Sequence, residues 1–382
     1  MPALNPIANW LENEQACSAR WHAENNSPPP KRIIIADDTL SADTAYRLAS
    51  QGTALLWRGD YQNGRQLLQA LARRVDKKKK LARAKNKPDS PPTLLDAFNQ
   101  HRLHQSQRTQ LLNKLLIELD ADATIPLRRA PDVQDACWAS LGDTHEPFLL
   151  SLRALQGIIG AHEWRKKGVF IAALGRPIHV HYGVFSPNRG EYLNLVAQAP
   201  LPATNLAFDI GTGSGVLAAV LAQRGVKNII ATDQDPRALA CARENIDRLG
   251  YGKAIDLQDV DLFPAGTSPL IVCNPPWLPA KPTTPIERAI YDPESSMLLG
   301  FLNGLAAHLQ AGGEGWLIMS DLAEHLGLRS REFLTQAIAT AGLRVLDRID
   351  AHPQHPKAMD ASDPLHAARS AEITSLWRLT HA

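Results

Sequence analysis

The pattern of apolar and polar positions changes near the middle of the chain. In about the first 165 residues, apolar side chains recur at helical spacing. The segment 65–74 places Leu67, Leu68 and Leu71 on one helical face, and a second leucine run extends from about residue 94 to 119. This spacing predicts a mainly helical N-terminal domain.

From about residue 168 onward, short apolar runs alternate with helical segments. The runs that read as strands lie at residues 206–210, 227–232, 269–273, 315–319 and 372–379. Strands and helices that alternate at this spacing predict an α/β fold, in which a mostly parallel sheet is covered by helices on both faces. Since 382 residues exceed one ordinary core, we expect two domains, at residues 1–165 and 166–382.

One helix of the second domain has clear signals at both ends. Asp235 suits the N-cap and Pro236 the first helical position. An apolar stripe follows, and Gly250 supplies the stop at the C-terminal end. The stripe consists of Leu239, Ala242, Ile246 and Leu249.

Composition narrows the class of protein. No apolar run approaches the roughly 20 residues that span a membrane. The first residues lack the basic start and apolar stretch of a signal peptide, so we expect a cytoplasmic protein without a membrane partner. The four cysteines form no C-x-x-C pair, and Cys241 and Cys273 fall in a predicted helix and strand. Buried free thiols are therefore the favoured interpretation, rather than disulfides.

Charge is concentrated in one segment. Residues 58–87 hold eleven Lys or Arg residues against Asp60 and Asp76, whereas the rest of the chain is mildly acidic. Such a segment can bind RNA phosphates. The alternative is a solvated, lysine-rich loop, and a proline-rich linker is predicted to follow it at residues 86–92.

A glycine-rich loop joins the first strand of the second domain to a helix. The segment Asp209-Ile-Gly-Thr-Gly-Ser-Gly215 places glycines at positions 211, 213 and 215, where backbone amides can approach a ligand closely. We predict that Asp209, Gly211, Thr212, Gly213 and Gly215 contact a cofactor. Asp209 would face one end of it and also hold the loop through backbone amides.

An acidic residue ends the next strand. Asp233 lies 22 residues after Gly211, where a carboxylate can accept both ribose hydroxyls of an adenosine. The loop and this acid fit either a nicotinamide dinucleotide or S-adenosylmethionine. A structural turn without a ligand is the remaining alternative.

The tetrapeptide Asn274-Pro-Pro-Trp277 decides between these ligands. With the loop, the acid at Asp233 and a further acid at Asp261, it gives the chain a motif order that resembles class I methyltransferases carrying an N-P-P-aromatic motif, over roughly residues 170–380. The resemblance implies a Rossmann-like sheet of seven strands and S-adenosylmethionine as cofactor. It also implies that Asp261 binds the adenine amino group, although Asp259 competes for that role.

The tetrapeptide suits methyl transfer to a planar nitrogen. Because the lone pair of an exocyclic amine or an amide is delocalised, the nitrogen is a poor nucleophile. The Asn274 side-chain carbonyl and the Pro275 backbone carbonyl can each accept one N–H and direct the lone pair at the methyl group. Pro275 and Pro276 stiffen the turn, and Trp277 offers a face for stacking. In-line transfer then depends mainly on positioning and demands no metal.

Two families that share this chemistry compete for the target. Residues 183–187, Gly-Val-Phe-Ser-Pro, resemble a stretch of the small-domain ribosomal RNA guanine-N2 methyltransferases. Residues 186–191 resemble, in an imperfect register, the entry motif of release-factor glutamine methyltransferases. We therefore expect an N-methyltransferase acting on RNA or protein, with rRNA processing favoured. A small-molecule methyltransferase and a non-catalytic cofactor-binding scaffold are the alternatives.

Overall fold

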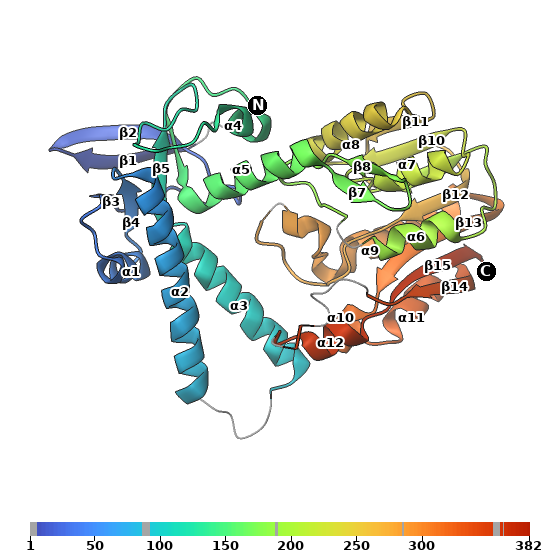
Figure 1. Cartoon of the computed structure of the whole chain (residues 1–382). Coiled ribbons are helices and arrows are strands. Elements are labelled where there is room, and N and C mark those ends of the chain that lie inside the picture. Colours follow the sequence, from blue (N-terminus) through green and yellow to red (C-terminus); the bar gives the residue numbers. More distant parts are fainter. Residues whose placement is uncertain (1–5, 86–91, 188–189, 285, 354–359, 362) are drawn as a thin grey trace. The chain divides into compact units, whose positions relative to one another are not determined.

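Two units make up the part of the chain that the computed structural model describes, namely residues 6–85, 92–187, 190–284, 286–353, 360–361 and 363–382 (Figure 1). The first unit combines the described parts of residues 1–92 and 99–163. The second combines residues 93–98 with the described parts of 164–382. Two helices, α3 (Leu94–Leu112) and α5 (Leu152–Lys167), contribute residues to both units.

The first unit is built around a sheet of six strands in the order β1-β2-β6-β5-β4-β3. Strands β3, β4 and β5 are parallel to one another, and β6 is antiparallel to β5. The strands are β1 (Ile7–Glu12), β2 (Gln15–Trp21), β3 (Ile33–Ala36), β4 (Ala54–Trp57), β5 (Leu115–Leu119) and β6 (Phe148–Ser151). The remaining helices are α1 (Ala42–Ser50), α2 (Tyr61–Lys85) and α4 (Gln134–Leu141).

The prediction of a mainly helical N-terminal domain was wrong in overlooking this sheet. Its central strands are four or five residues long and almost wholly apolar, and a short run of that kind has no period to distinguish it from a buried helix. For the same reason the helix predicted over 94–119 ends at Leu112, and residues 115–119 form β5.

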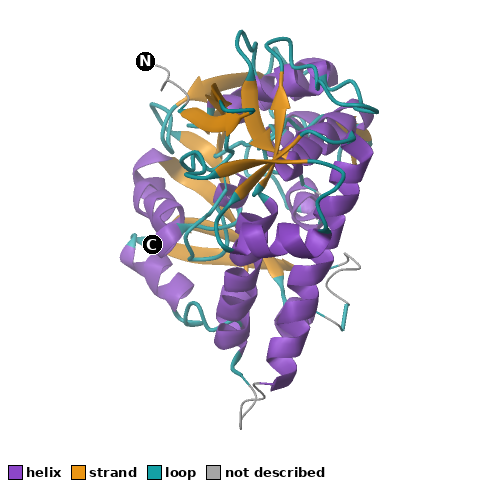
Figure 2. Cartoon of the chain, turned by 90° about the vertical axis from the view of Figure 1, so that its left-hand side faces the viewer, coloured by secondary structure: helices purple, strands orange, loops and turns teal. Residues whose placement is uncertain are grey.

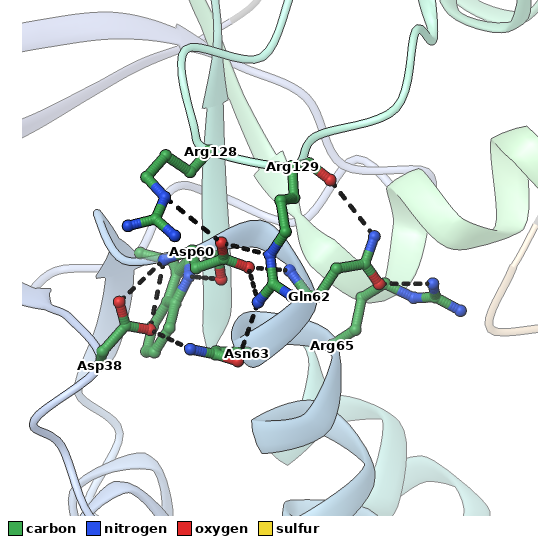
Figure 3. A network of polar contacts seen from close by, with 8 residues as sticks. Asp38, Asp60, Gln62, Asn63, Arg65, Arg128 and Arg129 are labelled. Carbon is green, nitrogen blue, oxygen red and sulfur yellow. Dashed lines mark hydrogen bonds and ion pairs between the residues drawn. The ribbon is translucent and has the colours of Figure 1, made fainter.

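A polar network lies at the carboxyl ends of β3 and β4 (Figure 3). Asp60 is almost fully buried, and its carboxylate accepts hydrogen bonds from Nε and one terminal nitrogen of Arg129, at 2.6 and 2.8 Å. Arg129 holds the pKa of Asp60 below its usual value. Asp38 accepts the Asp60 backbone N–H and the Asn63 side-chain amide. These polar groups satisfy one another, so we interpret the network as structural.

Most of the basic segment forms helix α2, which begins at Tyr61. The alternative prediction of a lysine-rich loop was therefore wrong for residues 61–85. Figures 1 and 2 show the long helices of this region, and Arg108 of α3 pairs with Asp76 of α2. Arg58 is engaged with Glu12 and Glu118. The predicted linker at 86–92 lies outside the described residues except for its last position.

The second unit has a sheet of seven strands in the order β11-β10-β9-β12-β13-β15-β14, which confirms the predicted Rossmann-like α/β fold. Six strands are parallel, and β15 is antiparallel to both of its neighbours. The strands are β9 (Ala207–Ile210), β10 (Ile229–Asp233), β11 (Ile255–Asp259), β12 (Ser268–Cys273), β13 (Leu309–Ser320), β14 (Leu343–Ala351) and β15 (Thr374–His381). A separate hairpin pairs β7 (Val169–Ile171) with β8 (Arg176–Ile178).

Helices cover both faces of this sheet. One core cluster joins the sheet to α6, α7 and α8, and another joins its opposite face to α9 and α11, because successive strand residues such as Ala207 and Phe208 point to opposite sides. The helices are α6 (Glu191–Gln198), α7 (Val216–Gln223), α8 (Pro236–Leu249), α9 (Ser296–His308), α10 (Leu322–His325), α11 (Phe333–Thr340) and α12 (His366–Ala371). Two short 3-10 turns, η1 (Ile286–Ala289) and η2 (Pro293–Ser295), precede α9.

Several local predictions are confirmed. In α8 the side chain of Asp235 caps the helix by accepting the Arg237 N–H, and Gly250 adopts the left-handed conformation at its end. Cys137, Cys241 and Cys273 are buried free thiols. Within the described residues no helix is both long and apolar enough to cross a membrane.

Candidate active site

The predicted motifs of the second unit gather at the carboxyl ends of three neighbouring strands. Strands β9 and β12 are parallel partners, and Ile210 pairs with Cys273. The next residues, Gly211 and Asn274, therefore leave adjacent strands at the same level. Strand β10 lies on the other side of β9 and ends at Asp233. Open parallel sheets bind ligands at this edge, where neighbouring strands connect in opposite directions.

The glycine loop has the backbone that its residues predict. Gly211, Gly213 and Gly215 have φ values of +70°, +56° and +79°, a region that other residues rarely adopt. A side chain at Gly215 would press on Ala242 of α8, so this glycine permits close helix packing. At Gly213 nothing lies within 4 Å of the position that a Cβ would take, so its backbone is open to a ligand.

Asp209 is fully buried beneath the loop. Its Oδ2 accepts the hydroxyl of Thr212 at 2.7 Å and the backbone N–H of Ala218 at 3.1 Å, so it holds the loop as predicted. Its Oδ1 has no partner within the described part of the chain. Burial raises the pKa of Asp209 to about 6, despite these two donors, and the nearby carboxylate of Asp233 adds to the rise. A cationic group of a ligand would satisfy the free oxygen.

This buried carboxyl predicts a pH effect on stability. Because the pKa of folded Asp209 lies above its unfolded value near 4, the stabilising contribution is complete below about pH 4 and is lost as pH rises through about 6. Asp209→Asn should therefore raise the free energy of unfolding of the cofactor-free protein at pH 8 by up to about 3 kcal/mol. Urea titrations at pH 4 and pH 8 measure this, and an equal difference between variant and wild type at both values would contradict it.

Asp233 is the last residue of β10, and Asp261 follows the end of the neighbouring strand β11. The Asp233 carboxylate accepts the backbone N–H of Gly213 at 3.0 Å and that of Asp235 at 2.9 Å. Burial raises its pKa. Gln234 donates its side-chain amide to exposed Asp261 at 2.6 Å. The ribose role of Asp233 and the adenine role of Asp261 stay predictions, and this position suits both.

The Asn-Pro-Pro-Trp segment follows β12 directly. Pro275 is buried and Pro276 half-buried. Trp277 is half-buried against both core clusters, and its indole Nε1–H donates to Asn274 Oδ1 at 3.0 Å. The oxygen expected to accept a substrate N–H thus already receives one donor and keeps its second lone pair for another.

Sequence reasoning missed the segment that joins these motifs, residues 291–297. Tyr291 forms a β-bridge with Leu278, just after the tetrapeptide. Buried Asp292 accepts the backbone N–H groups of Met297 and Leu298 and thereby caps the start of α9. The methyl group of Met297 would lie 2.6 Å from a Cβ at Gly211. The N-cap pattern of an Asp followed by Pro was the available signal.

Residues 278–290, which follow the tetrapeptide directly, include the turn η1 and backbone hydrogen bonds that return to Leu278. In the histidine-rich segment 350–366, His355 lies outside the described residues, and His366 begins α12.

The residues present fit S-adenosylmethionine. The molecule carries an ammonium, a sulfonium and a ribose. The orphaned oxygen of Asp209 suits a cation, the open backbone at Gly213 suits close approach, and Asp233 suits ribose hydroxyls. A buried carboxylate oxygen that has no hydrogen-bond donor in the described part of the chain is difficult to explain without such a ligand.

Comparison with known proteins agrees with this geometry. Residues 176–340 match the family described as methyltransferase small domain. The chain is 30% identical over 190 residues to a release factor glutamine methyltransferase of Cereibacter sphaeroides, covering 46% of this chain and 66% of that protein. It is 27% identical over 185 residues to a tRNA1(Val) (adenine(37)-N6)-methyltransferase of Shewanella amazonensis, covering 46% and 76%.

Solved structures are similar to about half of the chain or somewhat more. A ribosomal protein L11 methylase from Lactobacillus delbrueckii subsp. bulgaricus is 20% identical, with a TM-score of 0.37, over 52% of this chain and 81% of that one. A methyltransferase from Pyrococcus furiosus is 18% identical, with a TM-score of 0.38, over 60% and 99%.

Proposed function

We propose that this S-adenosylmethionine-dependent methyltransferase, whose residues 176–340 match the methyltransferase small domain, transfers a methyl group to a planar nitrogen of a macromolecule. The resemblance of residues 183–187 to ribosomal RNA methyltransferases makes a ribosomal RNA base the favoured target. The observation that carries the proposal is the β9–β12 register. It places the glycine loop and Asn274 at the same level of adjacent strands, about 5 Å apart.

The chain's own residues would perform three tasks. The glycine loop, Asp209 and Asp233 bind and orient the cofactor, which supplies an electrophilic methyl group when bound. Asn274 Oδ1 and the Pro275 carbonyl accept the substrate N–H groups and turn the nitrogen lone pair toward that methyl. Trp277 packs against the planar group. Positioning of this kind accounts for most of the rate acceleration of an in-line transfer.

A glutamine side-chain amide is the second candidate target. It has the same planar nitrogen chemistry, and the release factor glutamine methyltransferase similarity favours it. The buried free thiols support a reducing, cytoplasmic setting for either substrate.

The test uses radiolabelled S-adenosylmethionine, the purified chain and a lysate of a strain lacking the gene. We expect label in the RNA fraction. Label in protein would replace the RNA target by the glutamine amide, and label in the small-molecule fraction would overturn the macromolecular proposal. An Asn274→Ala sample processed in parallel separates transfer by this chain from residual activity of the lysate.

Trp277→Phe tests the bond inside the motif. Phenylalanine keeps an aromatic face but cannot donate a hydrogen bond to Asn274. The Asn274 side-chain amide is then no longer held in its orientation by the indole N–H. We expect kcat to fall about five-fold, the equivalent of one neutral hydrogen bond of about 1 kcal/mol, with KM nearly unchanged. Trp277→Ala, which also removes the face, should raise KM as well. A wild-type kcat in Trp277→Phe would show that the indole N–H has no part in catalysis.

A further inference from the structure

The end of α5 and the hairpin β7–β8 of the second unit carry exposed aromatic and basic side chains that have no role in the chemistry described above. Trp164 and Phe170 are 60% and 67% exposed, which places them among the most exposed large apolar side chains of the described residues. Residues 164–176 contain Arg165, Lys166, Lys167 and Arg176 and no acidic residue. We call Trp164, Lys167 and Phe170 the hairpin surface.

The hairpin surface rests on a rigid support. Ile171 and Ile178 are buried in the core of the unit, so Phe170, between Val169 and Ile171 on β7, points away from it. Arg176 donates to the carbonyls of Leu249 and Arg248, at 2.9 and 2.8 Å. The exposed aromatic ring is therefore held on a fixed strand rather than on a free loop.

The chain after the hairpin connects this surface to the candidate active site. The backbone N–H of His179 donates to Asn245 of α8, and His181 contacts Glu244. Arg165 at the end of α5 pairs with the same Glu244. Because Arg176 contacts the last residues of α8 and Asp233 precedes its first, about 20 Å of helix separates the hairpin contact from the cofactor end.

A ligand that reaches from the candidate active site to the hairpin surface must be long, which favours a polymer. Exposed aromatic rings beside basic side chains favour a polymer with planar bases and regular negative charge. Lys167 Nζ lies 5.9 Å from the centre of the Trp164 ring, so a cation and a stacking face are presented together. Single-stranded nucleic acid is bound by such pairs of aromatic faces and basic groups. We propose that the hairpin surface binds a single-stranded segment of the RNA substrate away from the methylated base. This inference rests on the proposed function and names a second contact for its substrate.

Binding of a fluorescein-labelled poly(U) strand, measured by anisotropy across a salt series, tests the inference on the full chain. The double variant Trp164→Ala, Phe170→Ala should weaken binding at least ten-fold, with an unchanged salt slope, because stacking releases no counterions. Lys167→Ser should lower the slope by about 0.7, the value for one lost phosphate contact. The matched controls Trp138→Ala, an exposed tryptophan of α4, and Lys227→Ser, an exposed lysine, should leave binding unchanged.

Affinity for S-adenosylmethionine, measured on every variant, shows that the second unit remains folded. Poly(U) binding within two-fold of wild type in the double variant would overturn the inference, and so would a wild type that does not bind poly(U) or a Trp138→Ala variant weakened as much as the double variant. Failure of the proposed function would appear differently, as a wild type that binds poly(U) through the hairpin surface but labels no fraction of the lysate.

Discussion

Asn274→Ala should reduce methyl transfer about a hundred-fold or more while leaving the affinity for S-adenosylmethionine within two-fold of wild type. The alanine removes the side-chain carbonyl expected to accept a substrate N–H as the nitrogen becomes pyramidal. That interaction strengthens only as the reaction proceeds, so its loss acts on kcat rather than on cofactor binding. The cofactor residues on the loop and at Asp233 contact other parts of the structure and remain in place.

The measurement combines single-turnover transfer with calorimetric titration of the cofactor. Asn228→Ala, an exposed asparagine that bonds only to the backbone of Asn205 among the described contacts of its side chain, is the control and should behave as wild type. Asn274→Asp keeps an oxygen acceptor for both Trp277 and the substrate N–H, so it should retain more transfer than Asn274→Ala. Equal losses of transfer and cofactor affinity in Asn274→Ala would mean that Asn274 supports the loop instead of the substrate.

The local signals in this chain predicted the second unit well because each acts over a few residues. Asp235, Pro236 and Gly250 define both ends of α8 without help from the rest of the fold, and the glycine loop takes its positive φ values from residue type alone. The strand ends then place Asp209 and Asn274 at one edge, since parallel strands share the direction of their carboxyl ends.

What was missed depends on contacts between distant residues. The approach of Met297 to Gly211 joins positions 86 residues apart, and no local pattern records it. The bond from Trp277 to Asn274 requires side-chain geometry as well as spacing. In the first unit, the strands Ala54–Trp57 and Leu115–Leu119 are buried on both faces, so they show no alternation to distinguish them from helix.

Asp233→Ala should weaken binding of S-adenosylmethionine by about a hundred-fold or more. The expected bonds from its carboxylate to two ribose hydroxyls are charge-assisted and contribute about 1.5–3 kcal/mol each, and about 1.4 kcal/mol corresponds to ten-fold in affinity. The same carboxylate holds the Gly213 amide, so the alanine also loosens the loop that surrounds the cofactor. Burial raises the pKa of Asp233, because a buried carboxylate is poorly solvated. Its charged form therefore depends more strongly on hydrogen-bond donors.

Two further variants separate the ligand contact from the support of the loop. Asp233→Asn keeps one carbonyl oxygen for a backbone amide but loses the charge, so it should bind cofactor at least ten-fold more weakly while unfolding at nearly the wild-type temperature without ligand. Asp235→Asn, which keeps an N-cap for α8, should retain cofactor affinity. If Asp233→Asn binds as wild type, the ribose must be held by another acid, and Asp261, bonded to the adjacent Gln234, becomes the next candidate.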